Sequence, residues 1–92
     1  MFSLTQIFPN AAKGFQIKFA NGYTVSVQWG PGNYCDNFTG DMRKTADDSA
    51  TAETAIITPD GAFLLYKGDD VQGHQTADDV AETIMFASRL TG

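Results

Sequence analysis

Few residues of this 92-residue chain have side chains suited to catalysis. Cys35 is the only cysteine and His74 the only histidine, and a thiol nucleophile needs such a base within hydrogen-bond reach. Asp36, Asp69 or Asp70 would orient the pair, but the two residues lie in different predicted loops, and Cys35 follows no helix N-terminus that would activate it. We therefore interpret Cys35 as a half-buried small apolar side chain and predict that the protein is not an enzyme.

Metal and phosphate binding are also poorly supported by the residue pattern. One cysteine and one histidine do not complete a tetrahedral zinc site within one chain. Asp36, Asn37 and Asp41 offer oxygen ligands, but they lack the spacing and the bidentate glutamate of a calcium-binding EF-hand loop. The stretch 30–33, Gly-Pro-Gly-Asn, offers backbone amides, but it has neither the Lys-Ser/Thr pair of a P-loop nor a helix directly after it. The sequence thus predicts no metal and no cofactor.

The same stretch is better suited to recognition. Two glycines around a proline specify a rigid, exposed turn, and Tyr34 follows it as an aromatic contact anchor. The rigid turn with Tyr34 favours binding over catalysis. The connection from Phe38 to Ala52 is polar and long for a compact domain, and such connections are often functional or disordered.

The composition is that of one globular domain, residues 1–92, with 42% apolar and 18% charged residues. The net charge of −5 disfavours direct binding to nucleic acid, which requires clustered lysine and arginine, and favours a basic partner or simply solubility. The apolar runs are too short to cross a membrane, and the chain begins with no signal-peptide pattern. With the single cysteine, these features predict a reducing cytoplasm.

The clearest element is a β-hairpin over Phe15 to Trp29, where apolar and polar residues alternate on both sides of Ala20-Asn21-Gly22. A two-residue loop would place each apolar row opposite a polar row. A three-residue loop, with Gly22 in the left-handed conformation, unites the apolar rows on one face, so we predict that register. The predicted facing pairs are Phe19 with Tyr23, Ile17 with Val25, and Phe15 with Val27. The opposite face, predicted to be solvated or in contact with a partner, carries Gln16, Lys18, Thr24, Ser26 and Gln28.

A second hairpin is predicted over Glu53 to Lys67, with Pro-Asp-Gly at 59–61 forming the same kind of loop. That register places Ile57 opposite Phe63, Ala55 opposite Leu65, and Glu53 opposite Lys67. The opposite charges of the last pair support it. Both of its faces are fairly apolar, which predicts a position near the centre of the sheet.

The chain is predicted to end in a helix after a polar loop over Gly68 to Gln75. Thr76 is a good N-cap, Asp78 and Asp79 suit the positive end of the helix dipole, and Arg89 in the last turn suits the negative end. At 100° per residue, the face predicted to pack on the sheet comprises Ala77, Val80, Ala81, Ile84, Ala87 and Ser88.

The predicted architecture is therefore α+β: an antiparallel sheet of about four strands, formed by two β-hairpins, packed by one C-terminal helix. Met1 to Gly14 precedes it as a short helix or an irregular strand. Phe86 and Leu90 lie outside the predicted packing face and need a cover. Either the Met1 to Phe8 segment packs on them, or they form a self-association or partner surface.

The segment 21–37, NGYTVSVQWGPGNYCDN, is followed by an acidic loop, by Gly-Asp-Asp-Val-Gln-Gly, and by a helix start reading Thr-Ala-Asp-Asp-Val-Ala. In this order the chain resembles, over Gly14 to Leu90, small uncharacterised proteins that bacteriophages and prophages encode. The GPGNYC stretch at 30–35 is the most specific part. The resemblance implies a small accessory protein in the host cytoplasm, of a kind that often binds and inhibits a host or defence protein.

The function expected from these observations is binding, and inhibition, of a host or defence protein without catalysis. The expected contact residues are Asn33, Tyr34, Asp36, Phe86 and Leu90, with a homodimer through Phe86 and Leu90 as a further use of the last two. One alternative is an oligomer that sequesters a phosphorylated nucleotide with Arg43, Lys44 and Lys67. The other is a Cys35-dependent enzyme.

Overall fold

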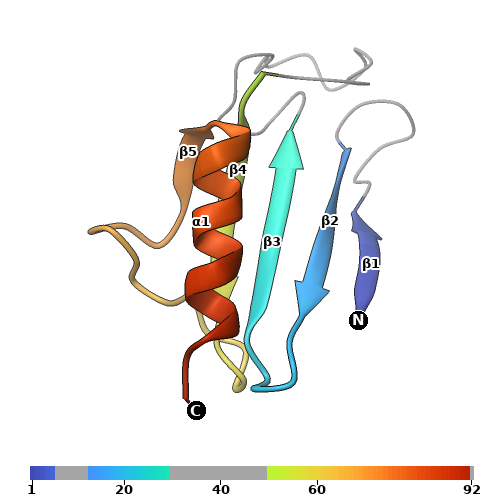
Figure 1. Ribbon diagram of the computed structural model, residues 1–92, viewed down its shortest axis with the longest axis vertical. Helices are drawn as coiled ribbons and strands as arrows, with labels where there is room; N and C mark the ends of the chain where they lie inside the picture. Colours follow the sequence, from blue (N-terminus) through green and yellow to red (C-terminus); the bar gives the residue numbers. More distant parts are fainter. Residues whose placement is uncertain (6–12, 30–49, 92) are drawn as a thin grey trace.

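The computed structural model describes residues 1–5, 13–29 and 50–91, which form a five-stranded antiparallel sheet and one helix (Figure 1). The spatial order of the strands follows the chain, from β1 at one edge to β5 at the other. The α+β class is confirmed, and the sheet has five strands rather than about four. The elements are β1 Phe2–Thr5, β2 Lys13–Lys18, β3 Thr24–Trp29, β4 Ala52–Ile57, β5 Gln72–Gln75 and α1 Ala77–Ser88.

The first hairpin has the predicted register. Phe15 pairs with Val27 and Ile17 with Val25, and the amide of Phe19 donates to the carbonyl of Tyr23 at 2.9 Å. Gly22 has φ +90°, in the region where only glycine is free of strain, as the three-residue loop requires. The apolar pattern therefore selected the loop length correctly.

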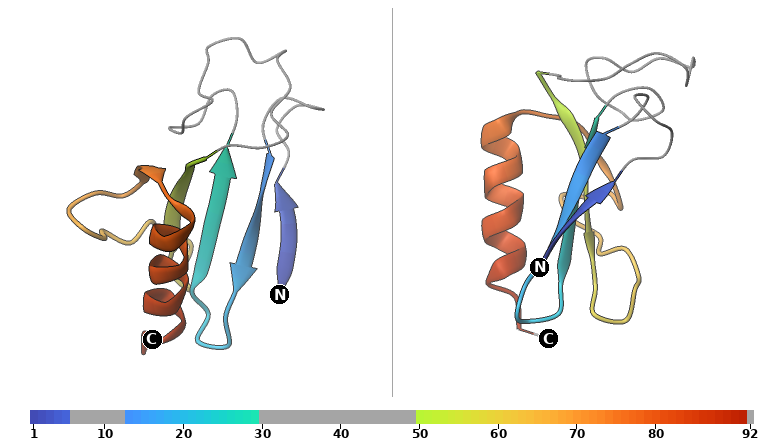
Figure 2. Two further views of the ribbon diagram at one scale, coloured as in Figure 1. Left: turned by 45° about the horizontal axis from the view of Figure 1, so that its top comes forward. Right: turned by 90° about the vertical axis from the view of Figure 1, so that its right-hand side faces the viewer.

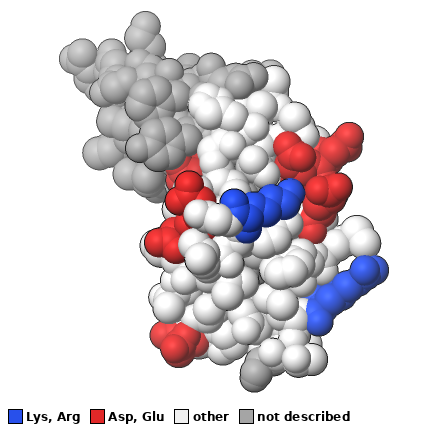
Figure 3. Space-filling view, turned by 90° about the vertical axis from the view of Figure 1, so that its left-hand side faces the viewer, with Lys and Arg blue, Asp and Glu red and all other residues white. Residues whose placement is uncertain are grey.

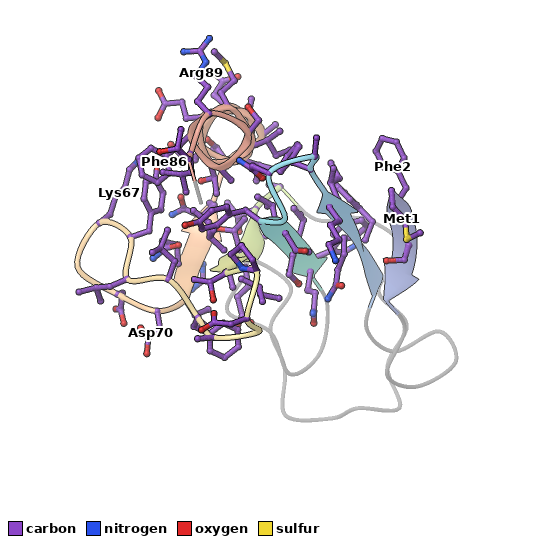
Figure 4. All side chains as sticks on the ribbon, turned by 90° about the horizontal axis from the view of Figure 1, so that it is seen from below. Met1, Phe2, Lys67, Asp70, Phe86 and Arg89 are labelled. Atoms are coloured by element: carbon purple, nitrogen blue, oxygen red, sulfur yellow. The ribbon has the colours of Figure 1, made fainter. Side chains whose placement is uncertain are left out.

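The N-terminal segment forms an edge strand. β1 pairs with β2, and the terminal amine of Met1 donates to the carbonyl of Lys18 at 2.9 Å. Phe2 stays 77% exposed at this edge, on the opposite side of the molecule from Phe86 (Figure 4). The expectation that Met1 to Phe8 covers Phe86 is thus wrong for residues 1–5, because pairing with β2 carries them to the far edge.

The second hairpin is only partly as predicted. The turn is correct: the amide of Thr58 donates to the carbonyl of Ala62 at 2.8 Å, and Gly61 has φ +91°. Ile57 and Phe63 form the predicted bridge. The predicted pairing of Ala55 with Leu65 is wrong, because a different strand, β5, pairs with β4 beyond this bridge.

The predicted pair of Glu53 and Lys67 is also wrong. Lys67 has φ +53° in a turn where Tyr66 and Asp69 form a bridge, and this turn sends the chain back into β5. The predicted polar loop over Gly68 to Gln75 is therefore a strand over its last four residues. A register shift beside His74, which has φ +53°, makes the pairing of β5 with β4 irregular.

Helix α1 begins as predicted. The Thr76 hydroxyl accepts from the amide of Asp79 at 3.2 Å, and the Asp79 carboxylate accepts from the amide of Thr76 at 3.0 Å, which completes a capping box. Arg89 is the C-cap residue rather than a residue of the last turn, so its predicted position is one step wrong. Its charge still lies next to the negative end of the helix dipole.

This cap predicts an acid-sensitive stability. The hydrogen bonds from Thr76, the backbone amide first and the hydroxyl second, hold the pKa of the Asp79 carboxyl below its ordinary value of 3.8. The folded state therefore favours the ionised form, and its contribution is full above about pH 4 and is lost as the pH falls through the lowered value. Denaturant unfolding at pH 6 and pH 2.5 should show a smaller loss of stability in Asp79→Asn than in the wild type. Equal losses would contradict this role.

The buried face of α1 is turned relative to the prediction. Ala87 is buried and Val80 and Ile84 pack against the core as expected. Thr83 is fully buried and the predicted Ala81 is exposed; the Thr83 hydroxyl donates to the carbonyl of Asp79 within the helix. Burial of this side chain therefore leaves no unpaired hydroxyl. The remaining predicted face residues, Ala77 and Ser88, are also exposed.

The core lies between α1 and one face of the sheet. Val25, Val27, Ala52 and Ile56 are buried with Ala87 beneath the helix, which packs on β3, β4 and β5. The segment between β4 and β5 extends beyond the opposite face (Figure 2), but Leu64 and Tyr66 within it pack against the core on the helix side. One face of the sheet is therefore covered by α1, whereas the other face is not.

Asn21 connects the first hairpin to the end of α1. Its side-chain amide donates to the carbonyls of Ala87 and Leu90, both at 2.8 Å, and its side-chain oxygen accepts from the amide of Tyr23 at 3.0 Å. The last carbonyls of a helix have no amide of a following turn to bind, so Asn21 stabilises this end of α1 together with the amide of Leu90, which donates to the carbonyl of Ala87 at 3.3 Å.

Candidate functional site

The predicted contact residues divide into two groups. Asn33, Tyr34 and Asp36 lie outside the described residues, as do Cys35 and the connection over 38–49. Phe86 and Leu90 are described, and they lie together at the C-terminal end of α1. The helix thus carries the part of the predicted site that can be located.

Phe86 and Leu90 line an open groove of about 400 Å³ on the outer side of α1, which we call the helix groove. Phe86 is 41% exposed and Met85 is 50% exposed. Glu82 and Arg89 complete its lining. Met85 was not among the predicted contact residues, because the predicted packing face included Ala81 and Ser88 beside it, whereas the buried face is turned toward Thr83.

Phe86 is held in place from the side. Its ring packs on that of Tyr66 with centroids 4.7 Å apart and planes inclined by 31°. The ammonium of Lys67 lies 5.4 Å from the centre of the Tyr66 ring and 3.8 Å from the Glu82 carboxylate. Figure 4 shows Phe86 and Lys67 on the same side of the helix. The aromatic part of the helix groove is therefore positioned before any partner arrives.

A second groove, of about 150 Å³, lies on the opposite face of the sheet, and we call it the sheet groove. Its floor comes from β2, β3 and β4, and one wall comes from the segment that joins β4 to β5. Ser26 and Ala55 are buried at this floor. The lining residues are Gln16, Ser26, Gln28, Glu53, Thr54, Ala55, Ile57, Phe63 and Val71.

The floor of the sheet groove was predicted as the polar face of the first hairpin. Gln16, Ser26 and Gln28 are on it as expected, and the side-chain amide of Gln28 donates to the hydroxyl of Ser26 at 3.1 Å. The wall residue Phe63 is 58% exposed. The sequence analysis did not find this groove, because it placed Phe63 in a regular strand rather than in a projecting segment.

The charges around these surfaces are mainly acidic. On the face shown in Figure 3, acidic side chains lie on both sides of the central basic patch, and a second basic side chain lies apart at the lower right. Lys67, proposed above as a phosphate ligand, is next to Glu82, and no lysine or arginine lines the described sheet groove. A phosphorylated ligand therefore finds no cluster of cations in the described residues.

The described residues also offer no metal centre and no membrane span. Among them, no three His, Cys, Asp or Glu side chains lie close enough to hold an ion. No helix in the described part of the chain is long and apolar enough to cross a bilayer. His74 is exposed on β5. The described residues therefore present open surfaces.

No protein-family model, no curated protein and no solved structure matches the chain. The resemblance to phage-encoded proteins therefore stays a prediction. The features that indicate a function are therefore the two grooves and their charges.

Proposed function

We propose that this chain is a non-catalytic binding module that takes up an extended, basic segment of a partner protein in the sheet groove. In the phage setting that the resemblance implies, the partner is a host or defence protein and binding inhibits it. The observation that carries the proposal is the exposed Phe63 beside a floor of amide and hydroxyl side chains.

The floor suits the backbone of an extended peptide. Glutamine side chains present both donors and acceptors, which is what a strand or loop with unpaired backbone groups needs. Gln16 on β2 and Gln28 on β3 are half-buried, and their two strands are paired. Their side-chain amides are therefore partly ordered. Ordered donors and acceptors bind with a smaller entropy cost than free surface side chains.

The wall supplies the apolar contact. Phe63 is 58% exposed, and Val71, near the other end of the same segment, is half-buried in the groove lining. Exposed aromatic side chains beside a polar floor are typical anchors of protein interfaces. The segment that carries them is fixed by the Thr58–Ala62 turn and by the bridge between Tyr66 and Asp69.

The charge of the groove determines the partner class. Glu53 lines it, and the whole chain has a net charge of −5. Complementary charge raises the rate of association and selects against acidic partners. A basic segment therefore fits better than the phosphorylated nucleotide of the alternative proposal. Arg43, Lys44 and Cys35 lie outside the described residues, so both alternatives stay predictions.

The proposal is tested by capture from bacterial lysate with the wild type, Phe63→Ala and Phe2→Ala. Phe2→Ala is the control, because it removes a phenylalanine that is even more exposed, 77% against 58% for Phe63, from the far edge of the sheet. We expect Phe63→Ala to weaken binding of the captured protein about 10-fold, whereas Phe2→Ala binds like the wild type. Tyr34→Ala in the same series tests the predicted loop contact.

The salt dependence gives a second readout. Binding to a basic segment should weaken as the salt concentration rises, because exposed charges are screened. No captured protein at physiological salt, or equal capture by Phe63→Ala and the wild type, would contradict the proposal.

A further inference from the structure

We propose that two copies of the chain associate through the helix groove, with their α1 helices antiparallel about a two-fold axis that passes between Met85 and Phe86. This inference goes beyond the proposed function, because it concerns the other side of the sheet. The occupant of the groove is a second copy of this chain.

The apolar centre of the interface is on the outer side of α1. Met85 and Phe86 are consecutive, half-exposed residues at the centre of the groove, and Leu90 continues it toward the C-terminal end. Phe86 is already ordered against Tyr66, so its burial in an interface costs little side-chain entropy. Ordered apolar side chains in an open groove favour association over continued exposure.

The charges at the two ends make this surface complementary to itself. Glu82 comes three residues before Met85, and Arg89 comes three residues after Phe86. Arg89 follows Glu82 by seven positions, which correspond to about 10 Å along a helix. In an antiparallel pair centred between Met85 and Phe86, each Glu82 therefore faces Arg89 of the second copy, and the contact occurs twice.

Other occupants match this pattern less well. A parallel pair would place Glu82 against Glu82 and Arg89 against Arg89, and like charges in contact oppose association. A basic or an acidic segment of another protein would satisfy only one of the two charges. Lys67, next to Glu82, and the exposed Arg89 side chain, which points away from the sheet in Figure 4, are compatible with the antiparallel pair.

The proposed dimer leaves the sheet groove accessible. Figure 2 shows α1 on one side of the sheet and the segment that forms the wall of the sheet groove on the other. A dimer would present two such grooves, and two linked sites bind a repeated or dimeric partner more tightly than one. An interface of one helix per copy is small, so we expect a dissociation constant on the order of micromolar.

The test is sedimentation equilibrium of the full chain from about 1 to about 300 μM, a range that brackets the expected constant. The variants are Glu82→Arg, Arg89→Glu and the double variant that exchanges both charges. Each single variant creates like charges at both ends of the interface and should raise the dissociation constant at least about 10-fold, whereas the double variant should restore the dimer. Circular dichroism of each variant shows whether it is folded.

Two further variants test the centre of the interface. Met85→Ser should also raise the dissociation constant, and Ala77→Ser, which changes an exposed helix position outside the groove, should not. A wild type that stays monomeric over the whole range would overturn the proposal. A dimer that persists in both single charge variants, or a double variant as monomeric as the single ones, would overturn it as well.

Discussion

Replacing Asn21 by alanine is expected to lower the free energy of unfolding by about 3 kcal/mol, since three hydrogen bonds of about 1 kcal/mol each are lost together. The carbonyls of Ala87 and Leu90 would keep no side-chain partner in place of the Asn21 amide. The amide of Tyr23 would lose its acceptor in the hairpin turn. For a small domain this is a large part of the total stability.

Urea denaturation followed by circular dichroism measures this loss. Asn21→Asp is the informative comparison, because its oxygen still accepts from Tyr23 but it has no amide to donate to α1. It also places a negative charge beside the negative end of the helix dipole. We therefore expect it to be no more stable than Asn21→Ala. If both variants lie within about 0.5 kcal/mol of the wild type, Asn21 does not anchor the helix.

The anchor also affects the helix groove. Leu90 lies beyond the end of α1, and its carbonyl is one of the two that Asn21 binds. A released C-terminal turn would no longer hold Arg89 and Leu90 in the position that the proposed dimer requires. Asn21→Ala should therefore weaken association as well as folding. The contacts of Asn21 thus couple a turn in the sheet to a surface on the helix.

The parts of the fold that could be predicted are those where side-chain pattern and backbone geometry agree. In the first hairpin, only one register unites the apolar rows, and that register needs the glycine that stands at position 22. The start of α1 was predictable for the same reason, because Thr76 and Asp79 have the spacing of a capping box. Local chemistry was sufficient in both places.

The second half of the sheet could not be predicted in this way. β5 consists of polar residues and glycine, so it has no alternating apolar pattern, and it is held by backbone pairing with β4. Lys67 was assigned a partner across the sheet because of its charge, yet a left-handed turn directs it to Glu82 on α1. A non-glycine residue in that conformation is unusual, so composition gave no signal for it.

The two surfaces differ in how far the sequence could locate them. Phe86 and Leu90 were found because large apolar residues off the packing face of a helix need a cover. The sheet groove was missed because it depends on Phe63, whose exposure follows from where the chain leaves β4 rather than from its own neighbours. Surfaces that lie within one element are predictable, and surfaces between elements require the tertiary structure.

Replacing Gly14 by alanine is expected to destabilise the sheet by about 3 kcal/mol, because the added methyl group collides with the main chain of β3. A Cβ atom at this position would overlap the carbonyl oxygen of Val27 and would lie 3.0 Å from the Cα atom of Gln28. Both contacts are with backbone atoms, which cannot move aside without breaking the β2–β3 ladder. Gly14 also pairs with Thr5 on β1, so both of its ladders would be disturbed.

Gly61→Ala separates this collision from the ordinary cost of replacing glycine. Gly61 has φ +91° and nothing within 4 Å of an added Cβ atom, so alanine there meets conformational strain alone, about 1 kcal/mol. Denaturant unfolding should therefore rank the wild type first, Gly61→Ala second and Gly14→Ala last. A Gly14→Ala variant as stable as Gly61→Ala would mean that β2 and β3 do not approach as closely as the structure has them. The position of β1 would then have to be reconsidered, because it reaches the rest of the sheet only through β2.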